Sequence, residues 1–148
     1  MEAKIKVTGQ NDLMGWVRKH GTEAEKDVKR IILNTGNNIR TDWMQNLAKK
    51  VKSTTKSKQS IQMEITKNGY GGAVFSGLDE LTFIEYGTRP HTIRIKRKKV
   101  LANVKTGDVF GKKVEHPGTQ PKPCLTPAAH KHLNKMENDL LALMRGNK

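Results

Sequence analysis

The chain has 148 residues, which suffice for one hydrophobic core and are too few for two, so we expect a single domain. Lys and Arg number 28 against 14 Asp and Glu, and the resulting formal charge of +14 favours nucleic acid, an acidic protein surface or an anionic membrane as partner. Hydrophobic residues make up 34% and aromatic residues 5%, which predicts a modest core and stability that depends on partners.

A membrane is the least favoured of these partners. No apolar run approaches the roughly 18 residues that span a bilayer, and the first residues lack the apolar core of a signal peptide. We therefore expect no membrane partner and synthesis in a cytoplasm.

The sequence also predicts no catalytic residues, no cofactor and no metal site. Cys124 is the only cysteine, which excludes an internal disulfide and a cysteine-rich zinc site, and we interpret it as a small buried hydrophobe. His130 and His132 are two positions apart, so they point to different sides of a helix. Neither a phosphate-binding nor a dinucleotide-binding glycine motif is present.

The first half of the chain predicts one long amphipathic helix. Residues 1–21 are ambiguous and are expected to be a mobile segment that ends at a break at Gly21 and Thr22. Beyond this break the helix would be on the order of 40 Å long at ~1.5 Å per residue, so part of it is expected to serve a neighbour. Gly36 costs about 1 kcal/mol relative to alanine and allows a kink or a break. The apolar stripe comprises Ala24, Val28, Ile31 or Ile32, Thr35, Ile39, Trp43, Leu47 and Val51.

Residues 49–60 are polar, basic and without periodicity, which predicts a flexible basic loop. A solvated linker is one interpretation. The other is an arm that touches DNA phosphates, which would be blind to sequence because no aromatic residue is present to stack on bases.

Residues 60–118 predict a β-sheet region made of two hairpins. Ile61, Met63 and Ile65 alternate with polar residues, and a turn at residues 67–69 leads to a second strand at 72–76. The second hairpin begins after residue 90. It carries the densest charge cluster of the chain, which is either a solvated edge that discourages aggregation or a surface that faces an anionic partner. The cluster consists of Arg94, Lys96, Arg97, Lys98 and Lys99.

Residues 126–145 predict a C-terminal helix. Thr126 is expected to cap it, and Pro127 takes the first helical position. Its apolar stripe is typical of a core face rather than a cofactor site. The fold class expected is therefore α+β, with an antiparallel β-sheet of hairpins packed against a long N-terminal-half helix and a C-terminal helix. The stripe comprises Ala129, Leu133, Met136, Leu140, Leu141 and Met144.

Two stretches that contain Gly, Thr and Pro look like the hinges of this domain. They read FIEYGTRPH from residue 83 and HPGTQPKPCLTP from residue 116. Phe83, Ile84 and Tyr86 are expected to anchor the sheet, with Gly87 turning the chain. Convergence of the side chains Glu85, Arg89, His91 and His116 near the hinges would allow general acid or base chemistry, which leaves a nuclease as a less favoured alternative.

These stretches also carry a resemblance to a known family. The motifs EYGT (85–88), HPGT (116–119) and PKPCLTPA (121–128) occur in the order found in the tail-component proteins of long-tailed double-stranded DNA phages, the family typified by the tenth gene product of a lambdoid coliphage. The likeness is clear from residue 60 onward and looser through the long helix. Cys124 departs from the family, whose members usually have an aromatic residue there, and the charge is higher than the family leads us to expect.

The resemblance implies a non-enzymatic virion or assembly protein at the head–tail joint or in tail completion. It implies a ring of subunits, often six, and we expect this ring to contact neighbouring head-connector and tail proteins. The charged hairpin is expected to meet either an acidic neighbour or, without sequence specificity, the double-stranded DNA in the lumen. We expect two surfaces to serve these contacts. The subunit-interface or turn motif comprises Glu85, Tyr86, Gly87, Thr88, Arg89, His116, Pro117 and Gly118, and the partner-facing surface comprises Arg94, Lys96, Arg97, Lys98 and Lys99.

A sequence-independent nucleic-acid-binding protein remains the main alternative, and it rests on charge alone.

Overall fold

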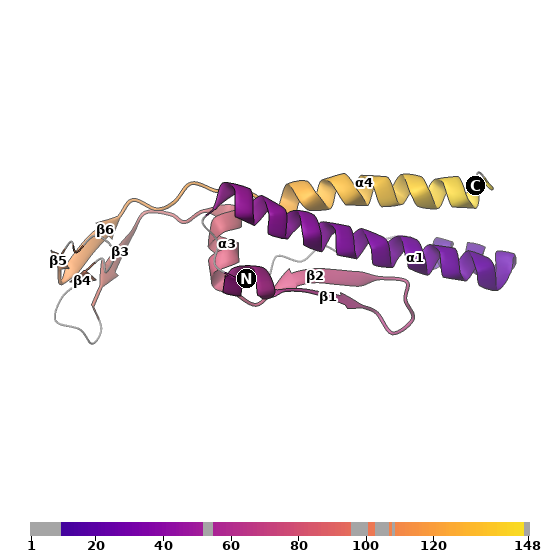
Figure 1. Ribbon diagram of the computed structural model, residues 1–148, viewed down its shortest axis with the longest axis horizontal. Helices are drawn as coiled ribbons and strands as arrows, with labels where there is room; N and C mark the ends of the chain where they lie inside the picture. Colours follow the sequence, from indigo (N-terminus) through magenta and orange to yellow (C-terminus); the bar gives the residue numbers. More distant parts are fainter. Residues whose placement is uncertain (1–9, 52–54, 96–100, 103–106, 108, 147–148) are drawn as a thin grey trace.

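The computed structural model of the chain describes residues 10–51, 55–95, 101–102, 107 and 109–146 (Figure 1). It confirms the α+β fold, with antiparallel hairpins and two long helices. The helices are α1 (Gln10–Lys50), α2 (Thr55–Gln59), α3 (Asp79–Tyr86) and α4 (Leu125–Met144). The strands are β1 (Ile61–Ile65), β2 (Gly72–Ser76), β3 (His91–Arg94), β4 (Leu101–Ala102), β5 (Val109–Gly111) and β6 (Lys113–His116).

Helix α1 is broken at Gly21, as the sequence predicts. Gly21 has φ 82° and ψ −167°, a conformation that residues with a Cβ rarely adopt. Leu13 and Ile32 line the same groove although they would be about 28 Å apart along a straight helix, so the chain folds back at Gly21. The section before the break is helical and buries Val17, whereas residues 1–9 of the segment expected to be mobile lie outside the described residues.

Gly36 does not break the helix. A Cβ there would lie 2.3 Å from Cε of Met63, so this glycine lets strand β1 approach the backbone of α1. The loop expected at residues 49–60 is also shorter than predicted, because α1 runs to Lys50 and α2 occupies Thr55–Gln59. Residues 52–54 lie outside the described part.

The core lies between α1, α4, α3 and the β1–β2 hairpin (Figure 1). Alternation in β1 places Ile61 in the core, and the antiparallel register pairs it with Ser76. The predicted stripes of α1 and α4 supply four of the other core side chains, namely Ile39, Trp43, Leu47 and Ala129. The buried cluster comprises Ile39, Trp43, Leu47, Ile61, Val74, Leu81, Cys124, Leu125 and Ala129.

Helix α3 corrects the sequence-based expectation for the segment before the first hinge. Its period of 3.6 residues turns Leu81, Ile84 and Glu85 toward the body, and it leaves Phe83 and Tyr86 54% and 58% exposed. Phe83 and Tyr86 therefore do not anchor a sheet. Ile84 alone of the three expected anchors packs against the core.

Residues 88–119 are called the arm, and the described part of the arm extends beyond one end of the helices (Figure 1). Within the arm β3 pairs antiparallel with β6, and β4 pairs antiparallel with β5. The second hairpin expected from the sequence is thus present, but it projects from the body.

Candidate functional site

Two regions gather the residues of interest. The first, which we call the junction, joins the arm to the body through residues 85–91 and 116–126. The second is an apolar groove near the C-terminal end of α4. The sequence pointed to the junction alone.

Glu85 is the buried acid of the junction, with 4% of its surface exposed. Its Oε2 accepts hydrogen bonds from the backbone N–H groups of Cys124 and Leu125, at 2.6 and 2.9 Å. Its Oε1 accepts from the backbone N–H and the hydroxyl of Thr126, at 2.8 and 2.6 Å. Glu85 of α3 therefore caps the N-terminus of α4 across a long span of sequence, where a negative charge is favoured by the helix dipole.

This arrangement corrects the predicted start of the last helix. Cys124 occupies the N-cap position without a side-chain capping bond, and α4 begins at Leu125. Thr126 lies in the first turn and donates its hydroxyl to Glu85 instead of capping the helix. Pro127 is two positions inside the helix start, where a backbone N–H would have no partner within the helix, so the proline is tolerated there.

The hydrogen bonds decide the charge state of Glu85. Burial by itself raises the pKa of this carboxyl, but the bonds from Thr126, Cys124 and Leu125 outweigh burial and hold the pKa below its ordinary value of 4.5. Burial, followed by the Glu85 charge, raises the pKa of the Cys124 thiol, in keeping with a buried and inert cysteine. Both oxygens of Glu85 are thus engaged in holding α4.

Gly87 and Gly118 let the two motifs of the junction approach each other closely. Both have positive φ, 72° and 83°. A Cβ on Gly87 would lie 2.4 Å from the carbonyl oxygen of Thr119, and a Cβ on Gly118 would lie 2.2 Å from that of Thr88. Glycine is therefore required at each position for two reasons. It can adopt the positive φ, and it has no Cβ to clash with the backbone of the opposite motif.

Thr88 and Thr119 form the bridge that this approach permits. The backbone N–H of Thr88 donates to the carbonyl of Thr119 at 3.0 Å, and the N–H of Thr119 donates back at 3.1 Å. Their hydroxyl oxygens lie 3.1 Å apart. The EYGT and HPGT motifs thus clamp the base of the arm.

His91 and His116 face each other just beyond this bridge. They are register partners, and their rings stack with centroids 5.0 Å apart. Nδ1 of His91 donates to the carbonyl of Arg89, and Nδ1 of His116 accepts from the N–H of Gly118. Of the four side chains whose convergence the sequence left open, His91 and His116 lie together, whereas Glu85 is turned to α4. Arg89 and Pro117 lie on the two segments of the chain that connect the junction to the arm, and Arg89 is exposed.

The arm has two chemically different faces. Directly opposed residues of an antiparallel pair share a face, so Ile93 and Val114 lie on the face of the histidines. Arg94 and Lys113 share the other face, together with Thr92 and Glu115, and there the Thr92 hydroxyl donates to Glu115 at 2.6 Å. Of the predicted basic cluster, Arg94 is exposed, while Lys96, Arg97, Lys98 and Lys99 lie outside the described residues.

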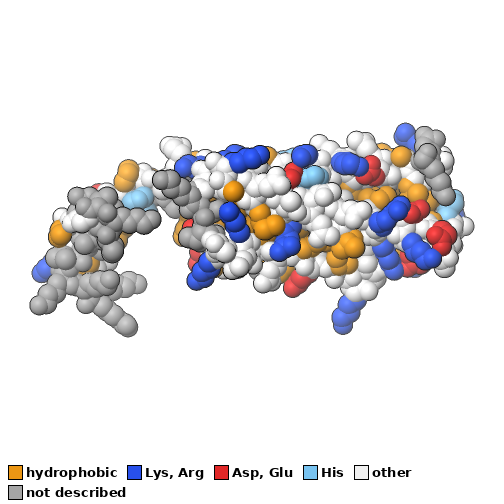
Figure 2. Space-filling model, viewed as in Figure 1, with side chains coloured by type: hydrophobic (Ala, Val, Ile, Leu, Met, Phe, Trp, Pro, Cys, Tyr) orange, Lys and Arg blue, Asp and Glu red, His pale blue; other side chains and the backbone are white. Residues whose placement is uncertain are grey.

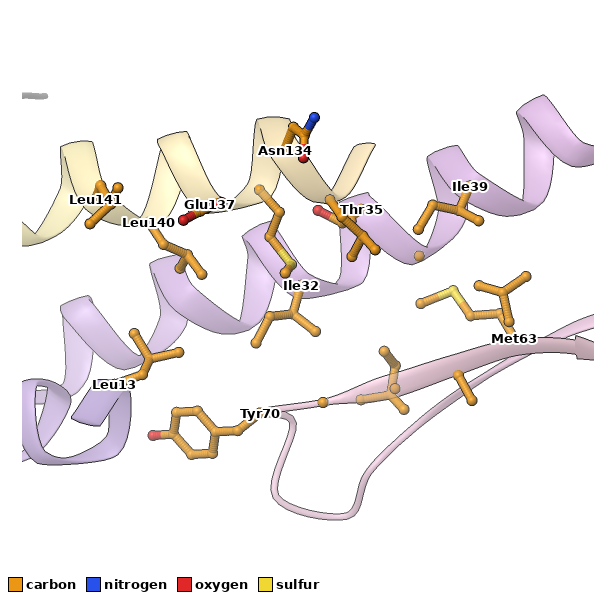
Figure 3. Close-up of a pocket in the computed structure, with 18 of the residues that line it drawn as sticks. Leu13, Ile32, Thr35, Ile39, Met63, Tyr70, Asn134, Glu137, Leu140 and Leu141 are labelled. Carbon is orange, nitrogen blue, oxygen red and sulfur yellow. The ribbon is translucent and has the colours of Figure 1, made fainter. Parts of the chain in front are cut away.

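The groove was not predicted. It has a volume of about 720 Å³ and is lined by α1, α4 and the β1–β2 hairpin (Figure 3). The C-terminal half of the α4 stripe borders it, with Leu141 and Met144 still 41% and 38% exposed. Figure 2 shows hydrophobic side chains at the surface of the body between those of Lys and Arg. The sequence signal that could have predicted the groove is the apolar stripe of α4, which continues to Met144. This stripe extends beyond the β1–β2 hairpin, so the hairpin does not cover its last residues.

The groove is apolar and bordered by negative charge. Asp12 and Glu137 supply its carboxylates, and no Lys, Arg or His is among the described residues that line it. This is unusual on a chain with a formal charge of +14. The large aliphatic side chains of the lining come from α1 (Leu13, Ile32, Ile39), β1 (Met63, Ile65), β2 (Val74) and α4 (Leu133, Met136, Leu140, Leu141, Met144).

Other chemistry is sparse in the part of the chain that the structure describes. It holds no group of three or more His, Cys, Asp or Glu residues placed to share a metal ion. None of its helices combines the length and the apolar character needed to cross a membrane. Comparisons with protein-family models, curated proteins and solved structures gave no match.

Proposed function

We propose that this chain is a non-enzymatic structural subunit of the neck or head-proximal tail of a long-tailed double-stranded DNA phage. It would act at the head–tail joint or in tail completion, as a ring of subunits, six being the number the resemblance favours, around the DNA channel. It would be made in the host cytoplasm and end in the virion, beside head-connector and tail proteins.

The observation that carries this proposal is the junction. Of the three motifs that resemble the phage family, EYGT lies far in the sequence from HPGT and PKPCLTPA, which follow each other closely, and it contacts both of them here. Thr88 bridges to Thr119, and Glu85 binds the N-terminus of α4 at residues 124–126. The shared residues thus hold a projecting arm on a helical body. A rigidly held arm is a means of contacting a neighbour.

The exposed apolar surface also favours a subunit over a self-sufficient monomer. Phe83 and Tyr86 are exposed beside the junction, and Leu141 and Met144 are exposed at the far end. Surface of this kind on a lysine-rich protein is typical of interaction sites. Two different apolar ends suit a heterologous contact, which closes into a ring when the rotation between subunits allows it.

Two measurements test the proposal together. Light scattering coupled to size-exclusion chromatography should give a defined oligomer, with rings visible by negative-stain electron microscopy. A plasmid copy should restore head–tail joining to a phage that lacks the gene. A protein that stays monomeric at high concentration and does not restore joining would refute the proposal.

The enzyme alternative is tested by replacing both histidines of the junction. If the chain is structural, the variant His91→Ala/His116→Ala should retain function in the joining assay provided that its oligomer is intact. Loss of joining with an unchanged oligomer would instead favour catalysis.

Sequence-independent nucleic-acid binding is the second candidate, and the charge of the arm favours it. Residues 88–119 contain nine Lys or Arg against two Asp or Glu. This candidate predicts an affinity for duplex DNA that falls steeply with salt. Absence of binding at about 0.05 M salt would exclude it.

A further inference from the structure

The arm and the groove are two surfaces that no other part of the described chain covers. The arm projects beyond one end of the helical body (Figure 1), whereas the groove runs along the body between α1, α4 and the β1–β2 hairpin. The arm therefore cannot reach the groove of its own chain while the junction is intact. Any contact between them joins two molecules.

The apolar surfaces match in kind. The face of the arm that carries Ile93 and Val114 is partly exposed, and Val109 on β5 is among the most exposed hydrophobic side chains described. The groove offers a lining of Leu, Ile and Met side chains between two helices and a hairpin (Figure 3). Packing the apolar face of the arm against the groove lining would remove both apolar surfaces from water.

The charges are opposite. Residues 88–119 carry nine Lys or Arg against two Asp or Glu. Arg94 and Lys113 are exposed on the face opposite to Ile93 and Val114, and Lys113 pairs with Glu115. The charge of the arm therefore attracts it to the groove at long range rather than through direct ion pairs of Arg94 and Lys113.

Asp12 and Glu137 are the charged residues among the described ones that line the groove. The nearby Lys29, whose Nζ lies 5.2 Å from the ring centroid of the lining residue Tyr70, is paired with Glu25. A basic arm is thus attracted to this groove, whereas the lysine-rich remainder of the body repels it.

From these observations we propose that the arm of one copy seats its Ile93 and Val114 face in the apolar groove of the next copy. The contact is heterologous, because each molecule gives its arm to one neighbour and receives the arm of another in its groove. It rests on the proposed function and names the contact that builds the ring. The groove is the site, and the partner is a second copy of this chain.

Cysteine cross-linking between two single-cysteine proteins tests the contact. Both carry Cys124→Ala to remove the native thiol, and one also carries Ile93→Cys while the other carries Leu141→Cys. The mixed proteins are treated with a short bis-maleimide. Leu33→Cys replaces Leu141→Cys in the control, because Leu33 is a similarly exposed leucine that does not line the groove.

We expect a cross-linked dimer containing one of each protein for the Ile93 and Leu141 pair, at least tenfold more abundant than for the Ile93 and Leu33 pair. An oligomer in light scattering without this selective cross-link overturns the arm-in-groove contact and leaves the ring proposal standing, with another surface or protein over the groove. A monomer overturns both.

A second set of variants does not depend on the reach of a cross-linker. Leu141→Asp should raise the concentration at which the oligomer dissociates by at least tenfold, and Leu33→Asp should leave it unchanged. Circular dichroism checks that both variants fold. Equal effects of the two substitutions, or none from either, would contradict the contact.

Discussion

Glu85 joins helices α3 and α4, which meet although Glu85 and Cys124 are 39 residues apart. Its carboxylate satisfies backbone donors that the helix start leaves unpaired, and a hydrogen bond to a charged group contributes more than a neutral one. At the scale of single residues, this carboxylate and the two junction glycines are the positions where a conservative change has the largest effect.

Replacing Glu85 with Gln should lower the free energy of unfolding by about 2 kcal/mol at pH 7, because a neutral amide accepts fewer and weaker hydrogen bonds. Urea denaturation measures the change. Glu64→Gln is the matched control, since Glu64 is exposed on β1. Similar losses in the two variants would contradict the capping role.

The same carboxylate predicts a pH dependence. The folded-state pKa of Glu85 is lower than its ordinary value of 4.5, so its stabilisation is complete above that value and is lost as the pH falls through the lowered pKa. The free energy of unfolding of the wild type should therefore fall more steeply below about pH 4.5 than that of Glu85→Gln. Parallel pH profiles would show that Glu85 does not titrate in this way.

Gly118→Ala should open the base of the arm. The new Cβ meets the carbonyl oxygen of Thr88, and the positive φ adds about 1–2 kcal/mol of backbone strain. Hydrogen exchange of the Thr88 and Thr119 amides should accelerate strongly. Gly111→Ala is the control, because Gly111 has a similar φ of 78° and a Cβ there would meet nothing within 4 Å, so it should leave those amides protected.

At the scale of secondary-structure elements, Asp42 of α1 makes polar contacts with two residues of α4. Its Oδ2 lies 2.8 Å from Nε2 of His132 and 2.8 Å from Nζ of Lys131. The hydrogen bonds from Lys131 and His132 lower the pKa of Asp42. Because the group is only partly buried, we expect a modest contribution.

A double-mutant cycle between Asp42→Ala and His132→Ala should give a coupling energy of about 0.5–1 kcal/mol at pH 6. The helical pair Lys135 and Asp139 provides the comparison, with an expected coupling of about 0.3–0.5 kcal/mol. Zero coupling in the first cycle would mean that the observed contact does not hold the helices together.

At the scale of the whole molecule, the described residues of the arm lie outside the hydrophobic core of the body. The buried core cluster contains residues of the body alone, among them Trp43, Leu47 and Ile61. The arm is joined to this body through the junction. Its removal should therefore cost the monomer little stability.

Replacing residues 89–118 with a short Gly-Ser linker should leave cooperative thermal unfolding with a midpoint within about 4 °C of the wild type, because no core side chain is removed. Light scattering should show the oligomer lost. A truncated protein that still assembles would place the subunit contact on the body, and a truncated protein that does not fold would show that the arm contributes to the core.

Local periodicity allowed much of the fold to be predicted. The stripe from Ala24 to Leu47, the alternation around Ile61 and the stripe of α4 each report one face of one element, and Gly21 marks the break. These features depend on neighbours a few residues away, so they can be read in the sequence. Helix α3 was missed because its eight residues span barely two turns, too short for a clear period.

The sequence by itself determined the α+β class and the main helices and hairpins. Only the tertiary structure decided that Glu85 caps α4, that Gly87 and Gly118 make room for opposing carbonyls, and that the α4 stripe ends in an open groove. The physical reason is the sequence separation over which each feature is set. Helix and strand propensity and amphipathic periodicity depend on residues close in the sequence. A capping partner, a close backbone approach and an uncovered apolar face depend on residues that only folding brings together.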